Sequence, residues 1–217
     1  MKLFLSSESV SHEQGRAFAE LIGKKLIDVK IAYIENASDV ASGNVSWVDE
    51  NRTNIEALGC KVIQIDLRDF GDESSEISLI DTLKPYDVIW LGGGNTYYLR
   101  WLLKKTGADS IIKELVKSGK VYGGASAGAI VAGPTINFFQ NADDPNEAKE
   151  IILDGLHLTE IVVVPHWDTD DYGSIMKVTE EKLKQAGYKT KHITNTQAMI
   201  INGEKVNIVP ASVKDQR

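Results

Sequence analysis

The stretch KVYGGASAGAIVA, residues 120–132, decides the fold, because an apolar run passes there into a helical pattern through a series of small residues. Gly124, Ser126 and Gly128 satisfy the pattern G-x-S-x-G, which is typical of a sharp strand-to-helix turn that exposes a serine hydroxyl. The small flanking residues let the serine adopt a strained backbone conformation. The stretch therefore predicts a nucleophilic serine, while a purely structural turn stays open as the alternative.

Short apolar runs recur along the chain and alternate with helical patterns. Their lengths are typical of buried parallel strands, and they cover residues 3–5, 30–34, 61–66, 88–91, 120–123 and 161–164. Asn202-Gly203 lies between two further apolar runs and predicts a hairpin. We therefore predict an α/β fold, a three-layer sandwich with a mostly parallel open sheet and a C-terminal edge hairpin, in a single domain spanning residues 1–217.

Composition limits the classes of function. The chain has 217 residues, 42% of them hydrophobic, and no linker divides it, so one substantial core is expected. A net charge of −7 with scattered lysines and arginines argues against a nucleic-acid partner. The single Cys60 excludes an internal disulfide. The apolar run among the first residues is too short for a signal peptide or a membrane span. We expect a cytoplasmic setting without a membrane partner.

A glycine-rich loop precedes the serine. The apolar run at 88–91 ends in three glycines, residues 92–94, whose amides can converge on negative charge near a helix N-terminus. A dinucleotide-binding G-x-G-x-x-G is excluded, because Tyr97 stands where the third glycine would be. The loop is therefore either an oxyanion-binding element or a structural tight turn.

A histidine follows the run at 161–164. In open parallel sheets the functional crevice lies outside the carboxyl ends of the strands. The glycine loop, Ser126 and His166 each follow a predicted strand, so we expect all three at the same edge of the sheet.

These three elements together resemble the peptidase E family of serine peptidases, which includes cyanophycinases and shares a fold with class I glutamine amidotransferase domains. The resemblance covers most of the chain and runs in order over GGGNT at 92–96, GASAGA at 124–129, PTI at 134–136 and PH at 165–166.

The resemblance implies roles for particular residues. Ser126 would be the nucleophile, His166 the general base, and the amides near Gly93, Gly94 and Ala127 the oxyanion donors. It also implies hydrolysis of short peptides, notably those with an N-terminal aspartate, or of β-linked aspartyl polymers.

The third catalytic member departs from the family pattern. The resemblance implies an acidic third member either at Asn141, on the loop fifteen residues after the serine, or in the late segment at Asn195, and neither is a carboxylate. An asparagine can orient an imidazole through its carbonyl oxygen but cannot stabilise the imidazolium by charge. We therefore expect Asn195→Asp to raise kcat if Asn195 has this role. The alternative is a catalytically impaired binding or regulatory protein on the same fold.

The remaining expectations concern substrate. Thr135, Trp167 and Asp168 are candidate substrate contacts, although Asp168 fits equally an orienter of the imidazole or a solvated loop. We expect no cofactor and no metal, a short peptide as partner, and an open oligomeric state with a homodimer as one option. Recognition of an aspartate side chain needs a basic group, and the sequence marks none of the candidates Arg16, Arg52, Arg68 and Arg100.

Overall fold

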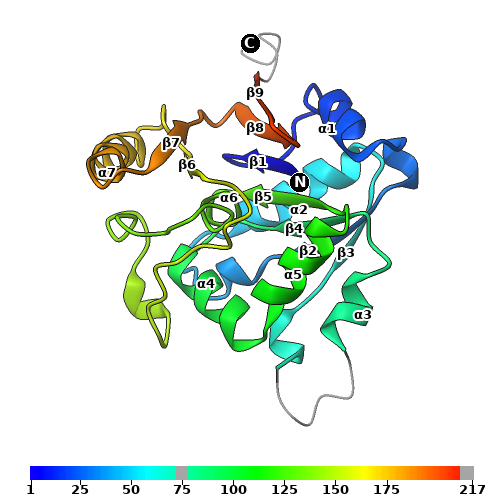
Figure 1. Cartoon of the computed structure of the whole chain (residues 1–217), viewed down its shortest axis with the longest axis horizontal. Helices are drawn as coiled ribbons and strands as arrows, with labels where there is room; N and C mark the ends of the chain where they lie inside the picture. The colour runs from blue at the N-terminus through cyan, green and yellow to red at the C-terminus, as the bar shows by residue number, and fades with distance from the viewer. Residues whose placement is uncertain (72–77, 211–217) are drawn as a thin grey trace.

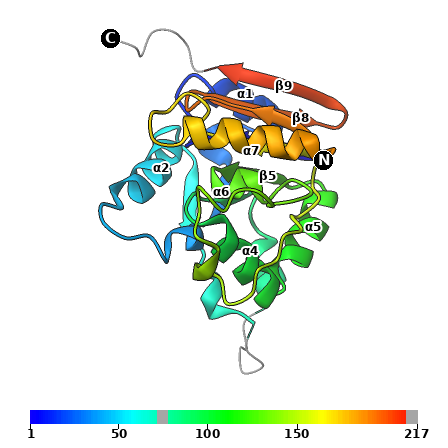
Figure 2. The ribbon, with the colours of Figure 1, turned by 90° about the vertical axis from the view of Figure 1, so that its left-hand side faces the viewer.

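The computed structural model describes residues 1–71 and 78–210 (Figure 1). Its main sheet has seven strands in the order β3-β2-β4-β5-β1-β8-β9. The strands are β1 (Lys2–Ser6), β2 (Lys30–Ile34), β3 (Lys61–Gln64), β4 (Val88–Leu91), β5 (Val121–Ala125), β8 (Gln197–Asn202) and β9 (Lys205–Pro210). The first five are mutually parallel, β8 runs antiparallel to β1, and β9 completes a hairpin with β8. The mostly parallel sheet with a C-terminal edge hairpin is therefore confirmed, and the hairpin forms one edge of the molecule in Figure 2.

Helices cover both faces of this sheet. They are α1 (Gly15–Ile22), α2 (Ser46–Ala57), α3 (Leu79–Leu83), α4 (Thr96–Lys105), α5 (Ala108–Lys117), α6 (Ala127–Ile130) and α7 (Gly173–Gln185). Short 3-10 turns lie at Leu26–Asp28, Asn36–Ser38, Leu67–Asp69 and Pro145–Glu147.

The two layers follow from the alternation of side chains along each strand. Leu3 and Leu5 of β1 belong to a cluster built with the apolar faces of α3, α4, α5 and α6. Phe4, between them, belongs to a second cluster with Phe18 of α1 and Ile55 of α2. The sheet therefore lies between two helical layers, as the predicted three-layer sandwich requires.

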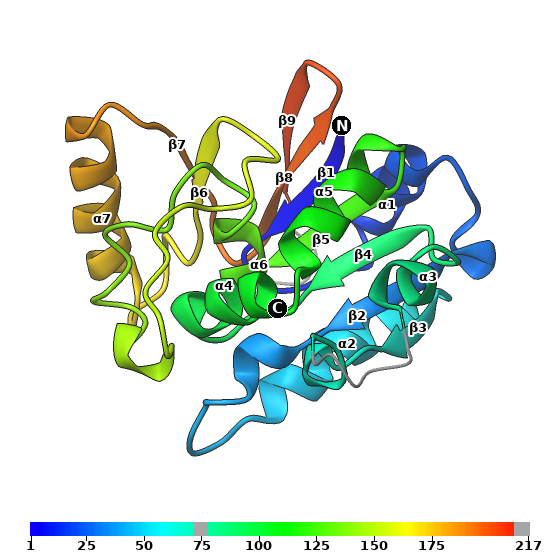
Figure 3. The same ribbon diagram turned by 60° about the horizontal axis from the view of Figure 1, so that its bottom comes forward.

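One strand does not lie where the sequence predicts. β6 (Ile161–Val164) is a buried parallel strand, but it pairs with β7 (Lys189–His192) in a separate two-stranded sheet. The reason is that β8 occupies the edge of β1 in the antiparallel direction, which leaves no place in the main sheet for β6. Figure 3 shows β6 and β7 beside α7, on the side of the molecule away from β2 and β3.

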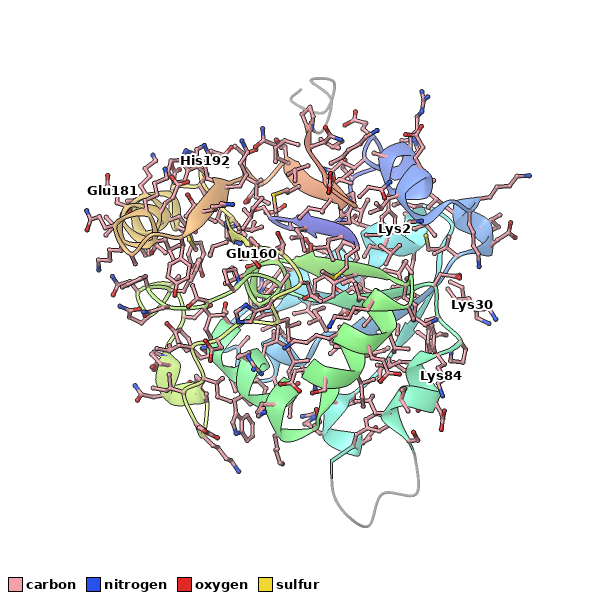
Figure 4. All side chains as sticks on the ribbon, viewed as in Figure 1. Lys2, Lys30, Lys84, Glu160, Glu181 and His192 are labelled. Atoms are coloured by element: carbon pink, nitrogen blue, oxygen red, sulfur yellow. The ribbon has the colours of Figure 1, made fainter. Side chains whose placement is uncertain are left out.

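Charged and titratable side chains are spread over the outside. Figure 4 labels six of them, all on the surface and all exposed except the partly buried Lys2: Lys2, Lys30, Lys84, Glu160, Glu181 and His192. The basic residues among them come from different elements, which agrees with the scatter seen in the sequence. Within residues 1–71 and 78–210, no helix is long and apolar enough to cross a membrane.

Candidate active site

The turn at Ser126 joins β5 to α6 in a conformation that is unusual for a residue with a side chain. Its φ is 48° and its ψ is −110°. The neighbouring glycines are required by close contacts of the backbone. A Cβ on Gly124 would lie 2.4 Å from the Gly128 carbonyl oxygen, and one on Gly128 would lie 2.1 Å from the Leu91 carbonyl oxygen. The G-x-S-x-G pattern therefore reflects tight packing of the helix start against β4 and β5.

Ser126, His166 and Asn195 form one hydrogen-bonded line. Nε2 of His166 lies 2.9 Å from Oγ of Ser126, and Nδ1 of His166 lies 2.7 Å from Oδ1 of Asn195. The three residues follow β5, β6 and β7, so strand ends from both sheets bring them together. The geometry selects Asn195 between the two asparagines, since Asn141 is exposed and forms no hydrogen bond with another described residue.

Ser7 contacts both His166 and Asn195 in this line, and the sequence did not predict it. Its Oγ accepts a hydrogen bond of 2.8 Å from the backbone amide of His166 and donates one of 2.9 Å to Oδ1 of Asn195. His166 itself has a φ of 56°, so this bond helps to fix a strained backbone position. Ser7 directly follows β1, the neighbour of β5, and the rule that sites lie beyond the carboxyl ends of strands could have found it.

Two carboxylates hold the other side of Asn195. Its Nδ2 donates to Oε1 of Glu8, and its backbone amide donates to Oδ1 of Asp168 over 3.1 Å. Glu8 was not among the predicted residues, although it too follows the first predicted strand. Asp168 is exposed in the loop after β6, and it contacts the third member of the line through the Asn195 backbone amide.

The glycine loop lies next to Ser126. A Cβ on Gly93 would be 3.3 Å from Cβ of Ser126. Gly94 has a φ of 133°, and a Cβ there would be 2.2 Å from the Ala37 carbonyl oxygen, so glycine is needed for the loop to pass. In residues 1–71 and 78–210, the amides of Gly93, Gly94 and Ala127 have no hydrogen-bond acceptor.

The amides on either side of Gly93 and Gly94 are used. Gly92 donates to the Ile34 carbonyl over 2.8 Å, and Asn95 donates to the Ala37 carbonyl over 2.8 Å. These bonds fix the ends of the loop and leave the amides between them available. Donors that are held in place near a nucleophile can bind a developing oxyanion.

The electrostatics favour a neutral imidazole. Burial lowers the pKa of His166 below its ordinary value of 6.5, while the hydrogen bond to Asn195 and the charge of Asp168 act in the opposite direction. At neutral pH the ring is therefore uncharged and can accept a proton. Burial, together with Asp168 and Glu50, raises the pKa of Glu8 above 4.5.

The other predicted contacts have different surroundings. The ring of Trp167 stacks on His192 with 4.0 Å between ring centroids, and Nζ of Lys177 lies 5.7 Å from the centroid of the Trp167 ring. Thr135 is buried, and its hydroxyl donates to the Leu153 carbonyl. The hydroxyl of Thr135 is therefore engaged with the chain 18 residues further on.

Two aromatic residues lie close to the line of Ser126, His166 and Asn195. The ring of Tyr172 lies 5.5 Å from that of His166, and Trp47 approaches within 3.6 Å of the Cβ position at Gly93. Tyr172 lies in the loop six residues after His166 and was not predicted, whereas Trp47 reaches the site from the start of α2, distant in the chain.

The arginines are all paired with carboxylates among the described residues. The pairs are Arg16 with Glu20, Arg52 with Asp49, Arg68 with Asp66 and Arg100 with Asp109. Arg100 is buried in its pair and also donates to the Asp154 carbonyl. Each of the four arginines therefore already has an anionic partner, so none of them is free to pair with a substrate carboxylate.

Comparison with known proteins agrees with this geometry. The model of peptidase family S51 matches residues 3–209. An uncharacterized peptidase of Listeria innocua is 33% identical over 178 residues, which is 81% of this chain and 82% of the relative. Peptidase E of Streptomyces coelicolor is 26% identical over 85% of this chain and 72% of the relative.

Solved structures give the same result. A crystal structure of a candidate peptidase E protein from Listeria monocytogenes EGD-e superposes with a TM-score of 0.82 at 30% identity, covering 97% of this chain and 98% of that one. A peptidase from an acI-B1 actinobacterium shares the fold, with a TM-score of 0.66, 19% identity, and coverage of 96% of this chain and 87% of that one. The match of nearly the whole chain, together with the serine turn and its histidine, leads to one assignment: the chain belongs to peptidase family S51 and is a serine-type peptidase.

Proposed function

We propose that this protein hydrolyses the amide bonds of short peptides with Ser126 as nucleophile and His166 as general base. The observation that carries the proposal is the hydrogen-bonded line from Ser126 through His166 to Asn195. It provides the nucleophile, the base and the group that orients the base, each within hydrogen-bond reach of the next.

The proposed reaction has two halves. Oγ of Ser126 attacks the substrate carbonyl carbon as its proton passes to Nε2 of His166, and the oxyanion accepts hydrogen bonds from the amides of Gly93, Gly94 and Ala127. The C–N bond then breaks as Nε2 returns the proton to the leaving amine. Water attacks the acyl-enzyme in the same way, and Ser126 recovers its proton.

Asn195 selects the tautomer that this reaction needs. Its Oδ1 can only accept, so Nδ1 of His166 carries the proton and Nε2 is left free to take the proton of Ser126. Ser7 donates to the same oxygen and thereby keeps the acceptor in place.

The substrate class that the site supports is a short peptide without a strict requirement for aspartate. An aspartate side chain would need a basic partner, and each of the four arginines within residues 1–71 and 78–210 is already paired with a carboxylate. The carboxylates of Glu8 and Asp168 next to Asn195 also make the surroundings of the site acidic.

A fluorophosphonate probe tests the chemistry directly, because it forms a covalent bond with an activated serine. We expect labelling of the wild-type protein and of Ser118→Ala, which removes a hydroxyl that donates locally to the Leu115 carbonyl. Ser126→Ala should not be labelled. Labelling that persists in Ser126→Ala would mean that another residue is the nucleophile, whereas a folded wild-type protein that is not labelled would indicate a binding or regulatory protein. A dipeptide library then compares Asp-X with Ala-X substrates.

A further inference from the structure

Glu8 extends the hydrogen-bonded line by one residue. Its Oε1 accepts from Nδ2 of Asn195, whose Oδ1 faces Nδ1 of His166. The order of contacts is therefore carboxylate, carboxamide, imidazole and hydroxyl. Glu8 lies beyond β1, and 187 residues separate it from Asn195 in the chain.

The direction of the Asn195 carboxamide decides which tautomer His166 adopts. If the amide were turned over, Nδ2 would face Nδ1 of His166, and the ring would have to accept there and carry its proton on Nε2. That ring could not accept the proton of Ser126. A carboxylate only accepts hydrogen bonds, so Glu8 stabilises the orientation with Nδ2 toward itself and Oδ1 toward the imidazole.

We propose that Glu8 is a positioning residue that fixes the Asn195 carboxamide and supplies, through it, the negative charge that a carboxylate would provide directly. The inference rests on the proposed function for its catalytic part. Hydrogen bonds in a chain polarise one another, so an anion on Nδ2 increases the electron density on Oδ1. The imidazolium that forms in the transition state is then stabilised more than by an isolated amide.

The groups around Glu8 do not neutralise it. Among the described residues, no lysine, arginine or histidine forms an ion pair with Glu8, and the charges that face it are those of Asp168 from the loop after β6 and Glu50 from α2. Within residues 1–71 and 78–210, the Asn195 amide is the only donor to its carboxylate. The neighbouring acids therefore disfavour an anion at Glu8. A carboxylate kept in such a place fits a role in positioning Asn195 better than a role in stabilising the fold.

The first experiment compares Glu8→Gln with Glu50→Gln, a neighbouring acid that does not touch Asn195. Glutamine keeps an acceptor for Nδ2 but removes the charge. We expect kcat on a dipeptide to fall about 10- to 100-fold in Glu8→Gln with KM little changed, and Glu50→Gln to behave as wild type. Equal kcat values and equal pH profiles for Glu8→Gln and wild type would overturn the proposal.

The second experiment exchanges the two groups. Asn195→Asp alone places two carboxylates against each other, so we expect kcat to fall rather than to rise as the sequence suggested. In the double variant Glu8→Gln with Asn195→Asp, the glutamine amide can donate to the new carboxylate, whose other oxygen faces His166. We expect kcat at least 10-fold above that of Asn195→Asp. A double variant no better than this single variant would contradict the inference.

A third measurement does not depend on turnover. The chain has four histidines, so the ring nitrogens of His166 can be assigned by ¹⁵N NMR against His166→Gln. We expect the Nδ1–H tautomer in the wild type and a mixture in Glu8→Gln. An unchanged tautomer would overturn the positioning role even if hydrolysis occurs, and a changed one would support it even if the protein proves inactive.

Discussion

The backbone strain at Ser126 can be measured through its effect on the free energy of unfolding. Its φ of 48° and ψ of −110° match the first central position of a type II′ turn, where glycine is favoured. A residue with a side chain in such a region costs about 1–3 kcal/mol. Replacing Ser126 with glycine removes that cost, whereas replacing it with alanine retains it. Both changes lose the hydrogen bond to His166, so this loss cancels when the two variants are compared.

Two terms oppose the gain in the glycine variant. The greater freedom of glycine in the unfolded chain costs roughly 0.5–1 kcal/mol. Loss of Cβ, which packs near Gly93, costs at most about 0.8 kcal/mol. Set against a central strain of about 2 kcal/mol, these terms leave Ser126→Gly about 1 kcal/mol more stable than Ser126→Ala.

Thermal unfolding followed by circular dichroism at pH 7 checks this value. For a chain of this size, about 1 kcal/mol corresponds to an increase in Tm of roughly 2–4 °C. Ala57→Gly, at the exposed end of α2, measures the ordinary cost of glycine in this protein. If Ser126→Gly melts below Ser126→Ala by as much as Ala57→Gly melts below wild type, the serine is not strained and the reasoning is refuted.

Three further predictions follow from burial and packing. kcat/KM should rise with pH as His166 loses its proton, through an apparent pKa below 6.5, because burial favours the neutral ring; a limb centred above 6.5 that persists in His166→Ala would contradict this. Gly128→Ala should lower the free energy of unfolding by about 1–3 kcal/mol or more in urea titrations, since its Cβ has no space, and a loss under about 0.5 kcal/mol would be inconsistent with the packing. Asp109→Ala should lower the free energy of unfolding by about 3–5 kcal/mol, because it leaves the buried Arg100 unpaired. Asp49 is exposed, so Asp49→Ala should lower it by less than about 1 kcal/mol. Similar losses in the last two variants would show that the buried pair is no more important than a surface one.

Several features of the fold and site could be predicted from local sequence. The glycines around Ser126 and the glycine loop report contacts between backbones that only residues without a side chain allow, so their pattern is visible in the chain itself. Alternate side chains along a strand belong to the two hydrophobic clusters, and the apolar runs that supply them are also visible in the sequence. His166 was placed correctly at the end of a buried strand, because the apolar run and the polar residue after it are adjacent in sequence.

The partners of these residues could not be predicted in the same way. An apolar run such as Ile161–Val164 predicts a buried strand but not the sheet to which it belongs, since pairing depends on which edge is already occupied. Thr135 matched the family pattern, yet its hydroxyl donates to the Leu153 carbonyl, 18 residues further along the chain.

The sequence by itself determined that this chain contains a serine on a strained turn, a glycine loop before it and a histidine after it. Only the tertiary structure decided that Asn195 rather than Asn141 faces the imidazole, and that Ser7 and Glu8 hold that asparagine from the opposite end of the chain. The physical reason is that a hydrogen bond requires a distance of about 3 Å in space, and two residues can reach that distance whatever their separation in the sequence. Residues 7, 8, 126, 166 and 195 become neighbours because β1, β5, β6 and β7 end close together.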